Sequence, residues 1–257
     1  MEMPRLSEQE LHIWILPVPE EETPEGKGMR PLRFEDFSAG ALDASERARA
    51  ERFRFPNDQR RFAMCRSALR HLAGSYAGLD PASIRFDTGE HGKPFLAKDL
   101  CSLPLQFNLS HTRGMGVFAF VLGDDEVGID VENSRRPVNE LELGARVFTP
   151  GELATLEPLD ARARRERFFA YWTAKEAFLK ATGFGLSLDP RKVEATLPDD
   201  ESSSGHFRAV ANAVDTSPWN LRSFCRNGDF RISLASPVRI MGDSIRVFNY
   251  ADLLPSG

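Results

Sequence analysis

The chain has 257 residues, of which 41% are hydrophobic and 28% are charged, and its formal net charge is −5. This length allows one large domain or two of about 130 residues, and either can bury a hydrophobic core. The acidic balance argues against a nucleic-acid-binding surface as the main function, because such surfaces are basic. The three cysteines lie far apart, in no metal-ligand spacing, which is typical of reduced thiols in a cytoplasmic protein. The first residues form neither a basic leader nor an apolar run long enough to span a bilayer, so we expect no membrane association.

In the N-terminal half, hydrophobic alternation and turn-forming residues predict short strands around two helices. The strands are predicted at 11–18, on both sides of the glycine turn within 83–96, at 105–111 and within 115–132. An acidic, proline-rich loop is expected at 19–28. The helices are predicted at 44–55 and 57–78, the second capped by Asn57 or Asp58 and ended by Gly78.

The C-terminal half begins with a helix start at Thr149, Pro150 and Glu152, a capping box with proline at the first helical position. A long helical pattern then runs from 160 to 182 and stops at Gly183. Strands are predicted at 192–197, 229–236 and 244–250. Because both halves combine helices with short strands, we expect an α+β protein of two similar lobes, residues 1–123 and 124–257.

The stretch "VGIDVE" at 127–132 places two carboxylates on one face of a predicted strand. Alternation sends Val127, Ile129 and Val131 to one side and Asp130 and Glu132 to the other. Like charges at this spacing raise each other's pKa unless they face water or a cation. A solvated strand face would explain the pair as well as a cation site would.

The stretch "FFAYWTAKEAFLKATGFGL" at 168–186 predicts a helix that is apolar on all sides and therefore buried. Its charged residues are Lys175, Glu176 and Lys180. Glu176 and Lys180 could form a simple pair one turn apart, with Lys175 extending to solvent. Charges on a buried helix are costly without partners, which favours a functional site. Together with Asp130 and Glu132, Glu176 would supply the hard oxygen ligands that suit Mg²⁺.

Several residues are candidates for binding an anion. Lys93 follows a glycine and precedes a proline in "GEHGKPFL", a rigid turn that could present its ammonium, although an ordinary hairpin lysine fits as well. Ser110 and His111 end the strand "FNLSH"; as strand neighbours they point to opposite faces, and no G-x-S-x-G elbow is present, so a serine hydrolase is excluded. A structural hydrogen bond would also explain His111. The arginines on the second helix form either a solvated face or a phosphate contact; they are Arg60, Arg61, Arg66 and Arg70.

Four segments, in this order and at matching intervals, resemble the Sfp-type 4′-phosphopantetheinyl transferases. They are "GKPFL", "FNLSH", "GIDVE" and "FAYWTAKEAFLKATGFGL", and the resemblance covers residues 45–188. It implies two α+β lobes related by a pseudo-two-fold axis, with the active site at their interface. It also implies Mg²⁺-dependent transfer of the phosphopantetheine arm of coenzyme A to a serine hydroxyl of an apo acyl or peptidyl carrier protein, with release of adenosine 3′,5′-bisphosphate.

The resemblance also implies residue roles. Asp130, Glu132 and Glu176 would be the Mg²⁺ ligands, and the coenzyme A pyrophosphate would complete the shell. Lys180 would stabilise or protonate the departing oxygen, while Glu176 or a water that it orients would be the base for the carrier serine. The residues expected to hold the nucleotide end, mainly its 3′-phosphate, are Arg61, Lys93, Ser110 and His111. The first lobe would thus bind the nucleotide, and the second would carry the metal site and the catalytic helix.

The chain departs from the family pattern in its first helix, where members often carry phosphate-gripping lysines. Here Glu46 stands beside Arg47 in an ambiguous register, so Arg47 and Arg49 are left outside the predicted site. Glu152 matches a further acidic position near the site. Two other functions remain open, a Mg²⁺-dependent nucleotide phosphohydrolase and a non-catalytic module that binds coenzyme A or a carrier protein. Because one chain contains both lobes, we expect a monomer.

Overall fold

The computed structural model describes residues 2–19, 42–89, 92–201, 203–210, 215–216, 219–237 and 244–254. From residue 20 on, the loop predicted at 19–28 lies outside this range. Within it, the helices are α1 (Ala44–Glu51), α2 (Pro56–Ala77), α3 (Glu140–Val147), α4 (Pro150–Leu156) and α5 (Ala161–Thr182). The strands are β1 (Leu11–Pro17), β2 (Phe86–Thr88), β3 (Pro94–Leu96), β4 (Leu105–Thr112), β5 (Met115–Leu122), β6 (Gly128–Asn133), β7 (Val193–Thr196), β8 (Gly205–Ala209), β9 (Trp219–Arg226), β10 (Phe230–Pro237) and β11 (Ile245–Asn249).

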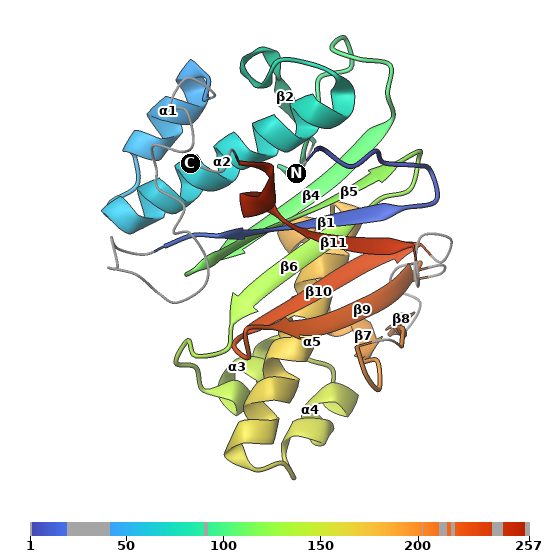
Figure 1. Cartoon of the computed structure of the whole chain (residues 1–257). Helices are drawn as coiled ribbons and strands as arrows, with labels where there is room; N and C mark the ends of the chain where they lie inside the picture. Colours follow the sequence, from blue (N-terminus) through green and yellow to red (C-terminus); the bar gives the residue numbers. More distant parts are fainter. Residues whose placement is uncertain are drawn as a thin grey trace.

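Two sheets lie face to face between helices (Figure 1). The first sheet has the strand order β11-β1-β5-β4 and the second the order β6-β10-β9-β8-β7, while β2 and β3 form a separate hairpin. A 22-residue helix packs on the outer side of each sheet, α2 on the first and α5 on the second. The predicted α+β class is confirmed.

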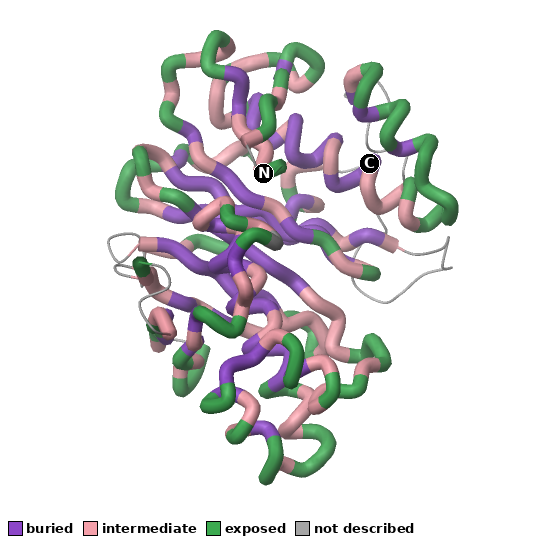
Figure 2. Tube along the Cα trace, turned by 180° about the vertical axis from the view of Figure 1, so that it is seen from behind, coloured by how far each residue is buried: buried purple, intermediate pink, exposed green. Residues whose placement is uncertain are grey.

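Strand β1 shows why the two sheets stay together. Its residues are buried on both faces, because Trp14 and Leu16 pack toward α2 while Ile13 and Ile15 pack toward the second sheet. Strands covered on both sides read as continuous apolar runs rather than alternating ones. Apolar residues of both sheets pack together between them, among them Ile129 of β6. Figure 2 shows this buried centre, with the exposed residues on the outer helices and loops.

The C-terminal segment mostly completes the second sheet, as expected, except for its last strand. Strand β11 pairs in parallel with β1, and the following Tyr250 is buried in the core below α2. The chain therefore returns to the first sheet at its end. The predicted division of the chain near residue 123 stays a prediction.

Helices α1 and α2 differ from the predictions at one end each, and three elements were not predicted. The N-cap of α2 is Phe55, without a side-chain cap, and not Asn57 or Asp58. Pro56 occupies the first helical position, where its missing N–H costs nothing. The helix therefore begins earlier in the chain than predicted. Helix α3 was not predicted, although Asn139 caps it by accepting from the Glu142 N–H. Strands β8 and β9 were also missed.

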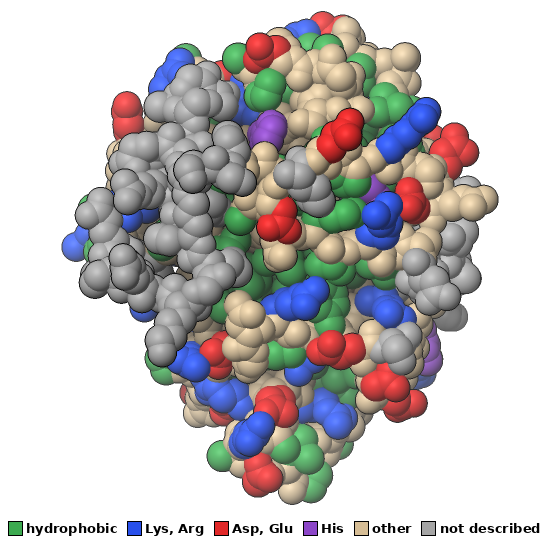
Figure 3. Space-filling view, viewed as in Figure 1, with side chains coloured by type: hydrophobic (Ala, Val, Ile, Leu, Met, Phe, Trp, Pro, Cys, Tyr) green, Lys and Arg blue, Asp and Glu red, His purple; other side chains and the backbone are tan. Residues whose placement is uncertain are grey.

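The described residues contain no helix that is both long and apolar enough to cross a membrane. All three cysteines have free thiols, as expected. On the face drawn in Figure 3, basic and acidic side chains are interspersed.

Candidate active site

The site begins where β4, at the edge of the first sheet, lies beside β6, at the edge of the second. Polar side chains of β4, two residues apart, bind β6. Asn108 is buried and its Oδ1 accepts the Ile129 N–H at 3.0 Å. The Ser110 hydroxyl donates to Asp130 Oδ1 at 2.7 Å. Side-chain bonds thus fix the strand that carries the predicted carboxylates.

The cation opposite Asp130 comes from α5. Lys180 Nζ lies 2.6 Å from Asp130 Oδ1 and 2.8 Å from Ser110 Oγ. The structure therefore does not use Lys180 for the simple pair with Glu176, one turn away, that the sequence also allowed. Three predicted site residues from three elements, Lys180, Asp130 and Ser110, are joined directly.

Gly128 lets α5 come this close to β6. A Cβ atom at this position would lie 2.0 Å from the carbonyl oxygen of Ala177 and 2.5 Å from the nitrogen of Ala181. No side chain fits at such distances, so the backbones of helix and strand touch here. The glycine of "GIDVE" consequently sets the depth at which Lys180 meets the carboxylates.

The acidic residues act on one another electrostatically. Burial raises the pKa of Glu176, and the charge of Asp130 raises it further, against the effect of Lys180. Burial also raises the pKa of Glu132, where Arg136 opposes the effect and Asp130 adds to it. Glu132 Oε1 lies 3.5 Å from the Arg136 guanidinium. The charge of Asp130 raises the pKa of both Glu132 and Glu176. Lys180 also contacts Asp130, so the two predicted segments, 127–132 and 168–186, meet at one place.

The chemistry of this place fits a hard cation. Asp130 Oδ2 is buried without a hydrogen-bond partner, which is costly unless a positive group completes it. The oxygen donors around it are of the type that Mg²⁺ prefers. In the described part of the chain, however, no group of three or more His, Cys, Asp or Glu side chains is arranged so that it could hold a metal ion. The metal roles of Asp130, Glu132 and Glu176 stay a prediction.

A positive region lies at the same end of β4, around His111. Removal of part of its hydration, together with the charges of Arg61, Lys180 and Arg49, lowers the pKa of His111 to about 4. The ring is therefore neutral at pH 7. Arg61 Nη2 donates to Asp58 Oδ1 at 2.6 Å, while its buried Nε has no hydrogen-bond partner. The charge of Arg61 thus acts on His111, and the predicted contact of both residues with a nucleotide stays a prediction.

Arg49, on α1, belongs to the same region, although the sequence left it outside the site. Its charge contributes to the lowered pKa of His111, and α1 packs on α2. An ambiguous helix register cannot be resolved without that contact.

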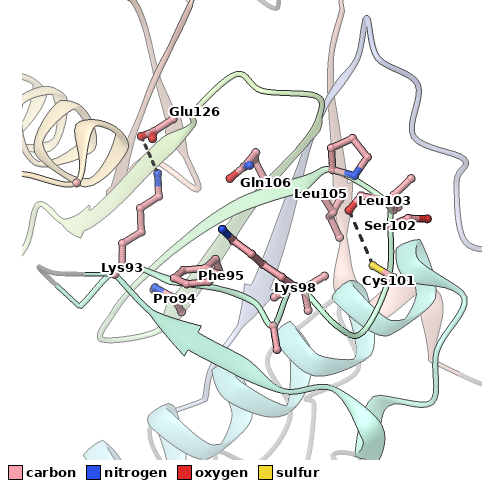
Figure 4. Close-up of a pocket in the computed structure, with 15 residues that line it drawn as sticks. Lys93, Pro94, Phe95, Lys98, Cys101, Ser102, Leu103, Leu105, Gln106 and Glu126 are labelled. Atoms are coloured by element: carbon pink, nitrogen blue, oxygen red, sulfur yellow. Dashed lines mark hydrogen bonds and ion pairs between the residues drawn. The ribbon is translucent and has the colours of Figure 1, made fainter.

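Lys93 contacts Glu126 and the C-terminal end of α5. Its Nζ donates to Glu126 Oε2 at 3.2 Å and to the carbonyl oxygen of Ala181, near the end of α5, at 2.9 Å. It lines a cavity of about 700 Å³ together with Phe95, Gln106 and others (Figure 4). Figure 4 shows its side chain extended toward Glu126, which also lines this cavity. Its predicted contact with a nucleotide stays a prediction.

Glu152 and Lys175 form a separate buried pair. Lys175 Nζ lies 2.8 Å from Glu152 Oε2, and both side chains are at most 4% exposed. Glu152 also accepts the N–H groups of Thr149 and Ala195, so it joins α4 to β7. Lys175 is therefore not extended to solvent, and the described contacts give Glu152 a structural role in fixing α5.

Comparison with known proteins identifies the family. The 4′-phosphopantetheinyl transferase superfamily model matches residues 126–235, and the model for the N-terminal part of 4′-phosphopantetheinyl transferases matches residues 33–122. The chain is 38% identical over 183 residues to the 4′-phosphopantetheinyl transferase HetI of Nostoc sp.. The matched part covers 71% of this chain and 72% of the relative. It is 26% identical over 228 residues to the 4′-phosphopantetheinyl transferase Sfp of Bacillus subtilis, covering 88% and 96%.

Among solved structures, the chain is similar to the holo-[acyl-carrier-protein] synthase of Thermotoga maritima, with 23% identity and a TM-score of 0.36 over 44% of this chain and 62% of that one. On the match to the Nostoc relative and the two family models, this chain belongs to the 4′-phosphopantetheinyl transferase family.

Proposed function

We propose that this chain transfers the 4′-phosphopantetheine of coenzyme A to a serine hydroxyl of an apo carrier protein, with Asp130, Glu132 and Glu176 as ligands of Mg²⁺. The observation that carries the proposal is the direct contact of Lys180 with Asp130 beside two carboxyl groups whose pKa values are raised. Acids that repel one another around a buried, unpartnered oxygen are suited to sharing a cation.

The reaction forms a bond between the serine oxygen and the phosphorus next to the pantetheine. The bond from that phosphorus to the bridging pyrophosphate oxygen breaks, and adenosine 3′,5′-bisphosphate leaves with the electron pair. Such reactions depend on alignment and on neutralising negative charge. Bound Mg²⁺ would supply part of that neutralisation.

Glu176 is the candidate base that accepts the serine proton, because a raised pKa favours proton acceptance near neutral pH. Lys180 would donate to the departing oxygen; its Nζ already bridges Ser110 and Asp130 and is held in place before substrate binds. Arg61 and His111, with Ser110 and Lys93, would hold the nucleotide through charge and hydrogen bonds.

The experiment is intact-mass spectrometry of several apo carrier proteins incubated with the enzyme, Mg²⁺ and coenzyme A. We expect a mass gain of one phosphopantetheine, and a loss of orders of magnitude in rate for Glu176→Gln. Glu166→Gln, on an exposed part of the same helix, is the matched control and should keep the wild-type rate.

Two results would favour the other functions. Release of adenosine 3′,5′-bisphosphate without any carrier would indicate a phosphohydrolase. Binding of coenzyme A that is independent of Mg²⁺, with no mass gain on any carrier, would indicate a non-catalytic module. We further propose that the enzyme is a cytoplasmic monomer; a mass near 28.8 kDa by light scattering would support the monomer.

A further inference from the structure

Three polar side chains alternate along β4 on the face that meets the second sheet. They are Asn108, Ser110 and Thr112, whereas Phe107 and Leu109 between them pack with the core below α2. Residues i, i+2 and i+4 of a strand share one face, so the three side chains form a row. Because β4 and β6 belong to different sheets, side chains rather than a backbone ladder join them.

Each member of this row bonds to a different residue of β6. Asn108 accepts a backbone N–H of β6, and the Ser110 hydroxyl donates to Asp130. Thr112 Oγ1 donates to Glu132 Oε2 at 3.3 Å. The row therefore follows β6 residue by residue, and its last member holds the second of the two carboxylates on that strand.

Thr112 lies at a point where the chain is packed tightly. It is the last residue of β4, directly before the turn into β5. Gly114 in that turn has a φ of 92°, and a Cβ atom there would lie 3.0 Å from Cζ of the Phe230 ring. Phe230, on β10, pairs with the residue of β6 that follows Glu132. The turn thus rests against the end of β6, which keeps the threonine hydroxyl beside the carboxylate.

A second donor competes for Glu132. Arg136 Nη2 lies 3.5 Å from Glu132 Oε1, and the guanidinium carbon lies 5.8 Å from the ring centroids of Phe169 and Trp172. A guanidinium can bind both oxygens of a carboxylate at once, which is the stronger arrangement. The bond from Thr112 holds Oε2 and so opposes that two-point ion pair.

We propose that Thr112 is a positioning residue for Glu132, whose hydroxyl keeps one carboxylate oxygen out of a two-point ion pair with Arg136 and available beside Asp130. The inference rests on the proposed function, in which Glu132 and Asp130 share a cation. A carboxylate oxygen has two lone pairs, so Oε2 can accept from Thr112 and still bind a metal ion. Carboxylates that bind metals depend on such hydrogen-bonded partners for their orientation.

The first test is calorimetric titration of Mg²⁺ into the coenzyme A complexes of wild type, Thr112→Val and Thr112→Ser. Valine keeps the shape of threonine and lacks the hydroxyl, so Thr112→Val should bind Mg²⁺ about tenfold more weakly. Thr112→Ser keeps the donor and should bind nearly as wild type does. The control is Thr196→Val, at an exposed strand position, which should leave the affinity unchanged. Transfer by Thr112→Val should need correspondingly more Mg²⁺, with kcat little changed at saturation.

The second test asks whether Arg136 is the competitor. Adding Arg136→Gln to Thr112→Val should recover most of the lost Mg²⁺ affinity, because the two-point ion pair can no longer form. Arg135→Gln, at the exposed neighbouring position, removes the same charge and should recover little. Arg136→Gln alone should also bind Mg²⁺ more tightly than Arg135→Gln does, so the competition can be measured even if Thr112→Val does not fold.

A third measurement tests the bond without any metal. Urea unfolding in the presence of a chelator is compared for Thr112→Val, Glu132→Gln and the double variant. If the hydroxyl bonds to this carboxylate in solution, the double variant loses less stability than the two single variants together. Additive losses would show that the bond does not form.

The outcomes separate this inference from the proposed function. Equal Mg²⁺ affinity for Thr112→Val and Thr196→Val would overturn the positioning role, and equal recovery by the two arginine variants would overturn the competition with Arg136. In both cases the wild-type protein would still modify its carrier. A wild-type protein that binds no Mg²⁺ and modifies no carrier would overturn the proposed function, and this inference with it.

Discussion

Gly128 shows how one residue without a side chain determines the site. The backbones of β6 and α5 approach so closely that a Cβ would meet the carbonyl of Ala177. The same approach brings Lys180 to Asp130. A substitution here must move the helix or the strand.

We expect Gly128→Ala to lower the free energy of unfolding by about 3 kcal/mol, as overpacking of a tight core does, and to lower transfer activity as well. Urea unfolding followed by circular dichroism measures the first effect. Gly89→Ala is the control, since its Cβ would meet only an ordinary contact at 3.7 Å. Equal stability of the two variants would show that β6 and α5 are not packed as described.

His12 gives the protein a pH dependence of stability. Its buried ring is hydrogen-bonded through Nδ1 to the Tyr76 hydroxyl, 2.7 Å away, and Trp14 Nε1 donates to that hydroxyl. Burial lowers the pKa of His12 from 6.5 to about 4; nearby Glu10 opposes this effect and Arg246 adds to it. Between about pH 6.5 and pH 4, the unfolded chain therefore binds a proton at His12 that the folded protein does not.

Stability should fall as the pH decreases from about 6.5 to about 4, and His12 should account for about 3 kcal/mol of that loss. Comparing urea unfolding of wild type and His12→Asn across this range isolates the contribution, because the variant lacks the titrating ring. His206→Asn, changed at an exposed position, should follow wild type. Parallel pH curves for wild type and His12→Asn would contradict this account.

At the scale of elements, the buried pair of Lys175 and Glu152 anchors α5. Besides Glu152, Lys175 Nζ donates to the carbonyl oxygens of Pro190 and Val193, so one ammonium joins α4, α5 and the start of β7. Burial lowers the pKa of Lys175 and raises that of Glu152, which means that each charge depends on the other.

Lys175→Met should therefore cost about 3–5 kcal/mol of unfolding free energy, since it leaves the Glu152 carboxylate buried without a counter-charge. Adding Glu152→Gln should restore part of the loss. The exposed Lys192→Met is the control and should have little effect. Denaturant unfolding of the four proteins measures both effects, and a Lys175→Met variant as stable as the control would show that the pair is not a structural anchor.

Local sequence patterns predicted most elements, because caps and stops act locally. Gly78 and Gly183 end α2 and α5 with positive φ, as expected. Alternation also placed Asp130 and Glu132 on one face. Tertiary contacts were beyond such patterns: the contact of Lys180 with Asp130 and the parallel pairing of β11 with β1 each depend on packing between distant segments.

At the scale of the whole molecule, two sheets with an apolar interface hold the edge strands β4 and β6 together. The site lies at this junction, so the first lobe contributes Ser110 and His111 and the second contributes the carboxylates. Buried apolar residues of both sheets form this interface, so the junction does not depend on a bound substrate. The carboxylates repel one another there, and a bound cation would relieve that repulsion.

The most direct measurement of the central claim is calorimetric titration of Mg²⁺ into the coenzyme A complex of wild type, Glu176→Gln and the control Glu166→Gln. We predict one Mg²⁺ per chain for wild type and the control, and binding at least tenfold weaker for Glu176→Gln, because a charged ligand is lost. Equal Mg²⁺ affinity in all three proteins would contradict the claim that Glu176 shares a cation with Asp130 and Glu132.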